Sequence, residues 1–265
     1  MGLVPMAHPP GRLTRACPNL ASSGPRAEGL EEADVIIVVG ADASITPLVF
    51  AGFCSLRALS SEFNDAPERA SRPFDRLRDG FVMGEGAAAL IVESWAHAKK
   101  RKARVYAELA GYAATSEAYH MVIPQEDGQE ISTTMKIGLD SAGIGPDQVD
   151  YINAHATSTT IGDAVEIKAI RILFKNRADK IAVNATKSLI GHTLGAAGAI
   201  GAVATTLSIH TGQIHPTANY EEPDPACRLD GIRRAVQDRK VRYALLNAFG
   251  FGSNNATVVF KKFVA

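Results

Sequence analysis

The stretch NATKSLIGHTLGAAGAIGAVATT, residues Asn184 to Thr206, decides the fold of this chain. It begins with two titratable side chains, Lys187 and His192, and continues as a run of glycine, alanine and small aliphatic residues. Residues 188–220 contain no Asp, Glu, Lys or Arg, although 21% of the chain is charged. A helix without a polar face has no side to turn to water, so we expect a fully buried helix from about Gly191 to about His210.

The small residues of this helix explain how it can be buried so deeply. Glycine costs a helix roughly 0.5–1 kcal/mol relative to alanine, so close packing must outweigh that loss at Gly195, Gly198 and Gly201. A membrane span is the weaker interpretation, because Leu, Ile and Val are sparse in the run. His192 lies near the start of the helix, where the helix dipole disfavours a charged imidazolium. A neutral imidazole there suits polarising a carbonyl.

The composition is that of an ordinary globular protein. Of 265 residues, 46% are hydrophobic, and the formal net charge is zero, which does not favour a nucleic-acid or membrane partner. Cys17, Cys54 and Cys227 are odd in number and far apart, which argues against disulfides and for a cytoplasmic location. The first 27 residues contain three Arg and no acid, so a mitochondrial or plastid location is the alternative. No zinc-ligand spacing is present, and we expect no metal.

The pattern along the chain alternates strands with helices. We expect no structure up to about Gly29, because that segment is rich in proline and glycine. The run ADVIIVVGAD is typical of a strand buried on both faces. Helices are expected around residues 47–59, 95–103, 128–143 and 162–174 and in the glycine-rich run. Such alternation predicts a mostly parallel α/β sheet covered on both faces. Strands are expected at 34–40, 87–93, 103–111, 150–154, 181–185, 242–248 and 255–261.

Unusual polar residues follow three of these strands. One strand leads to His155, the next to Lys187 and His192, and a third to the turn GFGSNN. A lone histidine is more often structural than catalytic, but two histidines and a lysine at neighbouring strand ends favour a functional site. A nucleotide site is disfavoured: GFGSNN lacks a third glycine and precedes a strand, and no phosphate-binding loop motif exists.

These residues lie in motifs that resemble those of a known family. NAHATSTTIGDAVE, NATKSLIGHTLGAAGA, NAFGFGSNNATVVF and RPFDRLRDGFVMGEGAAALIVE are similar to four signatures of the β-ketoacyl-acyl carrier protein synthases, the condensing enzymes of fatty-acid synthesis. ADVIIVVGADASITPL resembles the strand that precedes the fourth. The resemblance runs from Ala33 to the C-terminus and is strongest to the elongating type II enzymes. Thiolases share part of the pattern, but they require a second cysteine near the C-terminus that this chain does not have.

The resemblance implies a thiolase-like fold. Such a fold has two related halves, each a mixed five-stranded sheet around buried central helices, with the active site between them. By this comparison residues 1–32 are unmatched and expected to be disordered, 33–102 are a remnant of the N-terminal half, and 103–265 form the C-terminal half. We therefore expect an incomplete N-terminal half, with an exposed apolar edge and face where further strands would pack.

The resemblance also implies a reaction and a set of roles. The family transfers an acyl group to a cysteine, decarboxylates malonyl-acyl carrier protein and joins the two by a Claisen condensation. The substrates arrive on the phosphopantetheine arm of acyl carrier protein, and no cofactor is needed. His155 and His192 match the two histidines that stabilise the enolate, which is electrostatic stabilisation of developing charge. Lys187 matches the lysine that orders the histidines, and Glu166 matches its carboxylate partner. Phe251 matches the phenylalanine that gates the oxyanion hole. Thr157 and Thr159 match residues that contact the phosphopantetheine.

Some positions depart from the family pattern. Ala156 and Ser253 stand where glycine is usual, and Asn254 stands where Thr or His is usual. The nucleophilic cysteine of the family opens a buried helix in a T-A-C-[AS]-x-G element, where the helix dipole activates the thiolate. Cys17 lies instead in LTRACPNLASSGPRAEG, whose prolines and glycines do not fit such a helix. We identify no nucleophile.

Two classes of function follow from this reading. One is a β-ketoacyl-acyl carrier protein synthase, an acyltransferase that forms homodimers, with its condensing activity impaired here. The other is a non-catalytic pseudo-enzyme subunit, or chain-length partner, of a complete ketosynthase. The presence of His155, Lys187 and His192 favours the enzyme, because a purely structural partner has little need of all three.

Overall fold

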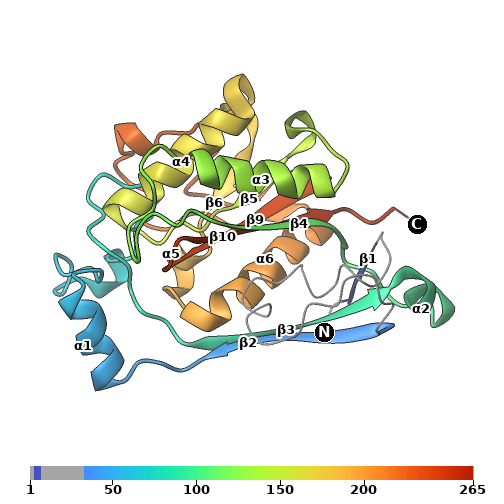
Figure 1. Cartoon of the computed structure of the whole chain (residues 1–265), viewed down its shortest axis with the longest axis horizontal. Coiled ribbons are helices and arrows are strands. Elements are labelled where there is room, and N and C mark those ends of the chain that lie inside the picture. The colour runs from blue at the N-terminus through green and yellow to red at the C-terminus, as the bar shows by residue number, and fades with distance from the viewer. Residues whose placement is uncertain (1–2, 7–32, 265) are drawn as a thin grey trace.

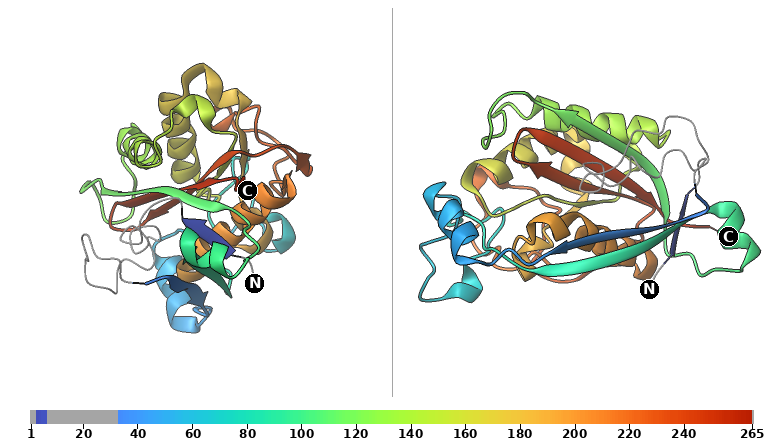
Figure 2. Two further views of the ribbon diagram at one scale, coloured as in Figure 1. Left: turned by 90° about the vertical axis from the view of Figure 1, so that its right-hand side faces the viewer. Right: turned by 60° about the horizontal axis from the view of Figure 1, so that its bottom comes forward.

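The computed structural model describes residues 3–6 and 33–264. Figure 1 shows their arrangement in four layers. Two helices lie on one face of a mixed sheet, a third helix lies on its other face, and two long strands lie beneath that helix. The two views of Figure 2 show the same order of layers.

The C-terminal half contains the mixed five-stranded sheet that the family resemblance predicts. Its strands lie in the order β4-β10-β9-β5-β6 and form part of an eight-stranded sheet, which continues from β4 through β1 (Leu3–Met6) to β3 and β2. β10 pairs antiparallel with both β4 and β9, whereas β5 pairs parallel with β9 and with β6. The expectation of a mostly parallel sheet is wrong for these five strands, because β10 pairs antiparallel with both of its neighbours and a tight turn joins it to β9. The strands are β4 (Glu108–Ser116), β5 (Tyr151–Asn153), β6 (Ala182–Asn184), β9 (Tyr243–Gly250) and β10 (Asn254–Lys261).

Two amphipathic helices cover the outer face of this sheet. α3 (Gln129–Ser141) and α4 (Thr160–Phe174) pack on it with fully buried residues such as Met135 and Ile170. Strand residues pointing the same way, including Leu245, join them in one apolar cluster. This burial is the main stabilisation of the C-terminal half, since a fully buried aliphatic side chain contributes about 1.5–3 kcal/mol.

The small-residue helix α6 (Ala197–Thr211) lies between the sheet and the strands β2 and β3. Its glycines allow this approach: a Cβ at Gly201 would lie 2.8 Å from the Leu246 side chain. By length and composition alone, Leu194–Thr211 could cross a membrane. Its position between β9 on one side and β2 and β3 on the other is that of a core helix. The helix is not fully buried as expected, because the strands cover two sides and leave the flank with Leu207 45% exposed.

The helix also begins later than predicted. Residues from Gly191 to Thr193 are not helical, and Gly191 has φ +72°. The helix α5 (Lys187–Ile190) precedes them, and a 3-10 turn at Leu194–Ala196 follows. The reason is that the backbone of His192 pairs with a neighbouring segment of the chain, as described below for the site.

The N-terminal half contributes the strands at the other end of this sheet. β2 (Val35–Asp42) and β3 (Gly86–Ser94) form an antiparallel pair, and the helices α1 (Pro47–Ser55) and α2 (Trp95–Lys100) follow the two strands. Val38 faces α6 and is buried, whereas Ile37 on the opposite face is 63% exposed. The expectation that both faces of this strand are buried is therefore wrong, because no described helix covers the outer face.

Two further expectations need correction. Leu3–Met6 form the strand β1, parallel to β3 and β4, inside the segment expected to be unstructured; this apolar tetrapeptide pairs although it contains Pro5. Residues 7–32, with Cys17, lie outside the described residues. The strand expected at 103–111 is β4, which begins at Glu108 and continues to Ser116. A Cβ at Gly111 would lie 2.6 Å from Gly138 O, so Gly111 marks a strand interior pressed on α3 and not a strand end.

The remaining elements are short. A two-stranded sheet is formed by β7 (Gln213–Ile214) and β8 (Gln237–Asp238). Single 3-10 turns occur at Pro67–Arg69, Pro146–Gln148, Lys175–Lys180 and Pro225–Cys227.

Candidate active site

His155 follows β5 and is fixed through its backbone. The buried carboxylate of Glu166 on α4 accepts bonds from the backbone N–H groups of His155 and Ala156, both at 2.9 Å. The side-chain amide of Asn247 donates a third bond to Glu166 at 3.0 Å. Ala156 has φ +29°, which explains why glycine is usual in the family at this position. Glu166 therefore fixes the direction in which the chain leaves β5.

Lys187 opens α5 and reaches back to His155. Its Nζ lies 2.5 Å from the carbonyl oxygen of His155 and 3.5 Å from Nδ1 of the same residue. Burial lowers the pKa of Lys187 to about 8, although the negative charges of Glu166 and Asp163 oppose the shift. Lys187 therefore remains mostly protonated at pH 7. Within the described ranges Glu166 forms no direct ion pair with Lys187, so the two interact through His155 and through space.

His192 is positioned by the N-terminal half. Its backbone N–H donates to Val82 O at 2.7 Å, and Gly84 N–H donates to His192 O at 3.0 Å. Gly84 permits this approach, because a Cβ there would lie 2.4 Å from Ile190 O. The backbone N–H of Leu194 donates to His192 Nδ1 at 3.2 Å. A neutral imidazole that accepts at Nδ1 carries its proton on Nε2.

The two imidazoles lie together. Their ring centroids are 5.7 Å apart, and the ring planes are nearly perpendicular. Burial, reinforced by the charge of Lys187, lowers the pKa of His192 to about 3. Burial, Lys187 and His192 together hold the pKa of His155 well below its usual value. Both rings are therefore neutral at pH 7, and with Nδ1 of each engaged, each has an Nε2–H to donate.

A chain of aromatic rings connects this pair to Phe251, the predicted gate. Phe251 contacts Phe53 of α1, with ring centroids 6.3 Å apart, and Phe53 contacts Phe81 at 5.1 Å. Phe81 contacts His192 at 5.4 Å, and Phe249 lies 5.5 Å from His155. The sequence analysis did not single out Phe53, Phe81 or Phe249. Phe81 and Phe249 lie inside the quoted family motifs, which could have pointed to them. Phe53 is one of several apolar residues of a predicted helix, so nothing in the sequence distinguished it.

The segment with Thr157 and Thr159 is held by a second buried carboxylate. The hydroxyls of these threonines lie 3.1 Å apart. Asp163 accepts from Ser158 N–H at 3.1 Å and from Phe74 N–H at 2.9 Å. Burial raises the pKa of Asp163 to about 7, against the charge of Arg78. Sequence reasoning missed Asp163, although its spacing of three from Glu166 places both carboxylates on one face of α4.

The described cysteines do not resemble an activated nucleophile. Cys54 is exposed on α1, and Cys227 is buried in a 3-10 turn. Burial raises the pKa of Cys227 to about 12, which keeps it a thiol at pH 7. In residues 3–6 and 33–264, no group of three or more His, Cys, Asp or Glu side chains is arranged to hold a metal ion.

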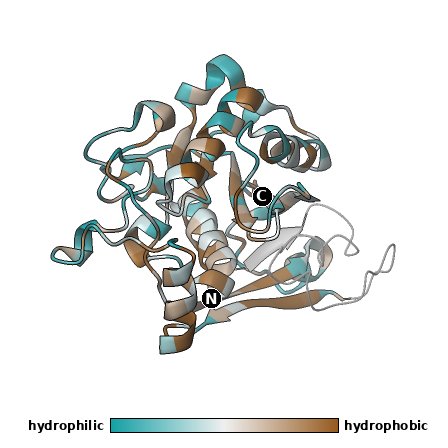
Figure 3. Ribbon diagram, turned by 60° about the vertical axis from the view of Figure 1, so that its left-hand side comes forward, coloured by the Kyte–Doolittle hydropathy of each residue, from teal (hydrophilic) through white to brown (hydrophobic). Residues whose placement is uncertain are grey.

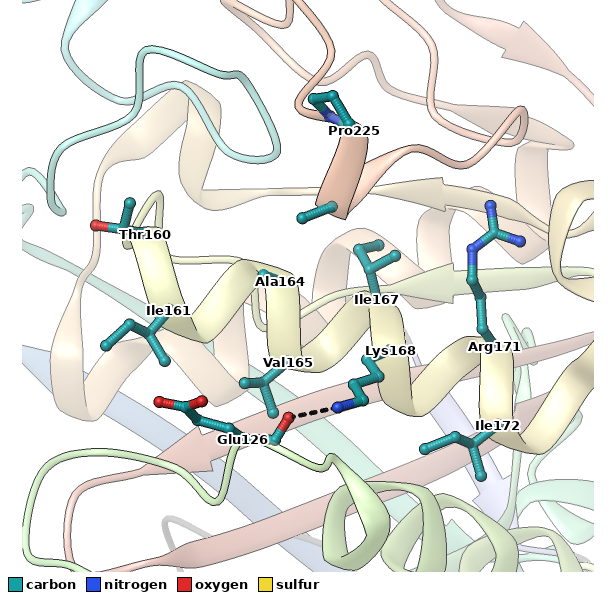
Figure 4. A pocket seen from close by; sticks show the side chains of 11 residues that line it. Glu126, Thr160, Ile161, Ala164, Val165, Ile167, Lys168, Arg171, Ile172 and Pro225 are labelled. Atoms are coloured by element: carbon teal, nitrogen blue, oxygen red, sulfur yellow. Dashed lines mark hydrogen bonds between the residues drawn. The ribbon is translucent and has the colours of Figure 1, made fainter.

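A groove of about 700 Å³ runs along α4 (Figure 4), and neither His155 nor His192 lines it. Its two basic side chains are already engaged, because Lys168 donates to the backbone carbonyl of Glu126 at 3.0 Å and Arg171 pairs with Asp179 at 3.2 Å. We assign no chemistry to it. The lining residues are Glu126, Thr160, Ile161, Ala164, Val165, Ile167, Lys168, Arg171, Ile172, Pro225 and Ala226.

Comparison with protein families places both halves of the chain in one family. The description "Beta-ketoacyl synthase, N-terminal domain" matches residues 29–98, and "Beta-ketoacyl synthase, C-terminal domain" matches residues 106–221. The second range contains His155, Glu166, Lys187 and His192. Together with the thiolase-like architecture and the paired histidines, these matches define a condensing-enzyme fold. The chain belongs to the β-ketoacyl synthase family.

Curated relatives agree with this assignment. The chain is 47% identical over 231 residues to 3-oxoacyl-[acyl-carrier-protein] synthase 2 of Coxiella burnetii, covering 87% of this chain and 56% of that protein. It is 48% identical over 232 residues to the chloroplastic 3-oxoacyl-[acyl-carrier-protein] synthase I of Hordeum vulgare, covering 88% and 50%. The chain thus spans about half the length of the curated relatives it matches.

Solved structures show the same fold. A type II PKS acyl-carrier protein in complex with its ketosynthase, AntDE:AntF, is 40% identical with a TM-score of 0.86, covering 88% of this chain and 57% of that chain. A β-ketoacyl synthase from Burkholderia phymatum is 34% identical with a TM-score of 0.83, covering 93% and 57%. The predicted thiolase-like fold and family are therefore confirmed.

Proposed function

We propose that this chain carries the histidine-bearing part of the active site of a β-ketoacyl-acyl carrier protein synthase of fatty-acid biosynthesis. The observation that supports this best is the pair of buried, neutral imidazoles of His155 and His192, 5.7 Å apart. Each is protonated on Nε2 because Nδ1 faces a donor, Lys187 for one ring and Leu194 N–H for the other. Two fixed donors at one place suit the stabilisation of an oxyanion.

The chemistry assigned to these donors is the decarboxylation of a malonyl thioester. Both Nε2–H groups bond to the thioester carbonyl, the bond to the carboxylate breaks, and CO₂ leaves. The electron pair remains as an enolate whose oxygen the two imidazoles stabilise. In the full reaction the enolate carbon attacks an acyl thioester and expels the thiolate that held it. Without an acyl partner, a solvent proton converts the enolate to an acetyl thioester.

The other site residues support these two donors. Lys187 fixes the tautomer of His155, and Glu166 fixes the backbone on which His155 stands. Thr157 and Thr159 contact the phosphopantetheine arm of the substrate, and the backbone N–H of Phe251 helps to form the oxyanion hole for the acyl group. The substrates are carried by acyl carrier protein, which one structural relative binds according to its description. The working form is a cytoplasmic homodimer that needs no cofactor.

Acyl transfer requires a further group, a thiolate that accepts the acyl chain. Cys227 is excluded by its raised pKa, and Cys54 is exposed in a helix, α1, that carries no basic side chain. We therefore expect this chain by itself to form no acyl-enzyme and to extend no acyl chain, with decarboxylation at most slow. A non-catalytic partner subunit has no specific observation in its favour, since the two histidines and Lys187 lie together.

The test is incubation of the purified chain with malonyl-acyl carrier protein, followed by mass analysis of the carrier. We expect slow conversion to acetyl-acyl carrier protein that His192→Ala and His155→Ala abolish. His210→Ala, which changes a histidine outside the site, is the matched control and should leave the rate unchanged. Conversion that persists in His192→Ala at the wild-type rate would contradict the assignment.

A second measurement addresses acyl transfer. The chain is incubated with an acyl-acyl carrier protein and its intact mass is measured. No stoichiometric adduct is expected on Cys54 or Cys227. An adduct on Cys17, outside the described residues, would show that the chain supplies its own nucleophile and that the impairment is wrong.

A further inference from the structure

A set of hydrogen-bonded side chains lies directly behind the candidate active site and takes no part in the proposed decarboxylation. Thr186 precedes Lys187, and its hydroxyl lies 3.0 Å from Asn153 Oδ1 on β5 and 3.1 Å from His215 Nε2. Asn153 is buried, whereas Thr186 and His215 are half-buried. The Thr186 hydroxyl therefore connects the turn that carries Lys187 with the strand that leads to His155.

The orientation of the Asn153 amide is determined by α6. Its Nδ2 donates to Gly201 O at 3.3 Å and to Thr205 Oγ1 at 3.1 Å. A backbone carbonyl can only accept, so the atom facing Gly201 is the nitrogen and the atom facing Thr186 is the oxygen. α6 is mostly white or brown in Figure 3, the colours of neutral and hydrophobic residues. No other described residue donates to Asn153 Oδ1, so this buried acceptor depends on the Thr186 hydroxyl.

The tautomer of His215 is determined in the same way. Its Nδ1 lies 2.8 Å from Pro216 O, which can only accept, so Nδ1 carries a proton. In the neutral ring Nε2 is then an acceptor, and it faces the Thr186 hydroxyl. One hydroxyl proton therefore lies between two acceptors, Nε2 of His215 and Oδ1 of Asn153. A charged imidazolium supplies the missing proton, because its Nε2–H donates to Thr186 while Thr186 donates to Asn153.

Two effects oppose each other at this histidine. Burial lowers the pKa of His215, and the hydrogen bond to Pro216 O acts against that shift. No charged side chain among the described residues contributes to it, although Lys187 follows Thr186 in the sequence. The Thr186 hydroxyl also favours the charged ring, since its own proton is held by Asn153 and its oxygen is left to accept. The half-buried ring can exchange protons with solvent, so it responds to pH.

We propose that His215 is a positioning residue of the candidate active site, and that its protonation tightens, through Thr186, the contact between the Lys187 turn and β5. When the ring is charged, Thr186 donates to Asn153 alone. When the ring is neutral, the hydroxyl proton is shared between two acceptors, and the link to β5 weakens. The contact that this link supports joins Lys187 Nζ to the carbonyl oxygen of His155. The importance of that contact rests on the proposed function.

The test is a pH titration of the histidine rings by NMR on the full chain. We expect the neutral ring of His215 to carry its proton on Nδ1. Thr186→Val, which removes the hydroxyl and keeps the shape, should lower the pKa of His215 by about one pH unit or more, because a hydrogen bond to the charged ring is lost. Thr186→Ser keeps the hydroxyl and should restore the pKa. Thr206→Val is the matched control, since the Thr206 hydroxyl is buried without a hydrogen-bond partner among the described residues, and it should change nothing.

A second signal tests whether His215 acts on the active site. The imidazole of His155 stays neutral from about pH 5 to 8, because its pKa lies well below its usual value, so its ring signals report changes that arise elsewhere. They should shift with the midpoint of His215, and this component should vanish in His215→Phe and in Thr186→Val. Lys187 and Asp163 also titrate near this range, with pKa values of about 8 and about 7. Their components should remain in both variants.

Three results would overturn the proposal. They are a neutral His215 ring protonated on Nε2, a pKa of His215 that is unchanged in Thr186→Val, and His155 signals without a component at the His215 midpoint. The last result is what a role of His215 in the fold alone would give. If Thr186→Val fails to fold, the tautomer and the His155 signals of the wild type decide the matter.

Activity separates this role from the proposed function. Decarboxylation of malonyl-acyl carrier protein that depends on His192 should fall roughly tenfold in Thr186→Val and recover in Thr186→Ser, since the link positions the site. Coupled His215 and His155 signals in a chain without such decarboxylation would uphold the positioning and contradict the function. Decarboxylation that depends on His192 without this coupling would do the reverse.

Discussion

Two strands of equal length on opposite sides of α6 have different surroundings in this molecule. β9 lies in the middle of its sheet with helices over its outer face, whereas β2 forms the edge of its sheet with its outer face open. Residues facing α6 are buried in both: Leu246 on β9 and Val38 on β2 belong to one apolar cluster. The difference lies entirely on the outer faces, where Leu245 is fully buried and Ile37 is 63% exposed.

The comparison shows that the apolar pattern of a strand indicates which faces are suited to burial, but not whether other elements cover those faces. The run VIIVVGAD has the continuous apolar character of a strand buried on both faces. In the structure only the face of β2 toward α6 is buried. The opposite face is equally apolar, but none of the described elements covers it. The candidate active site also depends on both halves, since the backbone of His192 is hydrogen-bonded to Val82 and Gly84 from the N-terminal half.

The largest expected effect comes from truncating the two equivalent side chains. Leu245→Ala removes a fully buried side chain from between the sheet and its helices, and it should lower the free energy of unfolding by about 2–5 kcal/mol. Ile37→Ala removes an exposed one and should change it by less than about 0.5 kcal/mol. Denaturant unfolding of both variants measures the difference. Equal losses would mean that β2 is covered on its outer face in solution.

The sequence predicted correctly those strands whose apolar side chains are buried against other described elements of the chain. The strands after which His155, Lys187 and Phe251 stand were placed within a few residues, because their apolar runs end at turn-forming residues. The pairing of the two histidines also followed, since ends of neighbouring parallel strands meet at one edge of a sheet. These predictions depend on apolar runs and on the order of strands and helices along the chain, and both can be read from the sequence.

Sequence reasoning failed where long-range contacts override local preference. The glycine-rich helix was expected from Gly191, but the pairing of His192 with Val82 and Gly84 delays it to Ala197. Asp163 was missed because its partners, Ser158 and Phe74, come from different parts of the chain. The exposure of β2 was missed because a strand's pattern carries no information on whether its cover is present.

The next effect compares two glycines. Gly111 in β4 is pressed on α3, where a Cβ would meet backbone atoms at 2.6 and 2.7 Å. Gly111→Ala should therefore cost about 1–3 kcal/mol through overpacking. Gly52 in the exposed helix α1 has nothing within 4 Å of such a Cβ, and Gly52→Ala should stabilise the chain by roughly 0.5–1 kcal/mol. Thermal unfolding should shift in opposite directions; a shift in the same direction would show that α1 is packed.

The buried His192 makes the free energy of unfolding depend on pH, and this dependence tests whether the N-terminal half covers His192. The pKa of His192 is about 3 in the folded chain, below its ordinary value. Between about pH 6.5 and 3 the imidazole of His192 is therefore protonated in the unfolded chain but neutral in the folded chain. The free energy of unfolding falls as the pH drops through this interval. Asp163, whose pKa is raised to about 7, acts in the opposite direction, so the histidine must be isolated by difference.

The measurement is the free energy of unfolding of wild type and His192→Gln at pH 7 and at pH 4.5. The wild type should lose roughly 1–3 kcal/mol more than the variant over this interval. The contribution of Asp163 is common to both proteins and cancels. Parallel curves would mean that His192 is solvated, and thus that the N-terminal half does not close over it.

The smallest expected effect concerns Ser253, in the turn between β9 and β10. Ser253 has φ +61°, a conformation that favours glycine, and its hydroxyl lies 2.8 Å from His120 O and 3.3 Å from His120 N. The hydrogen bonds to His120 explain how a serine is held where the family usually has glycine. Ser253→Gly removes these bonds but relieves the backbone, whereas Ser253→Ala removes them and keeps the steric cost.

Ser253→Ala should therefore be less stable than Ser253→Gly by about 1 kcal/mol, or a few degrees in the midpoint of thermal unfolding. The turn matters to the comparison because it carries Phe251, whose ring contacts Phe53 of α1 across the two halves. If the two variants unfold at the same temperature, the left-handed backbone at Ser253 does not determine the turn. The contact between Phe251 and Phe53 would then be what holds it, and Phe53→Ala should lower the midpoint by more than either serine variant does.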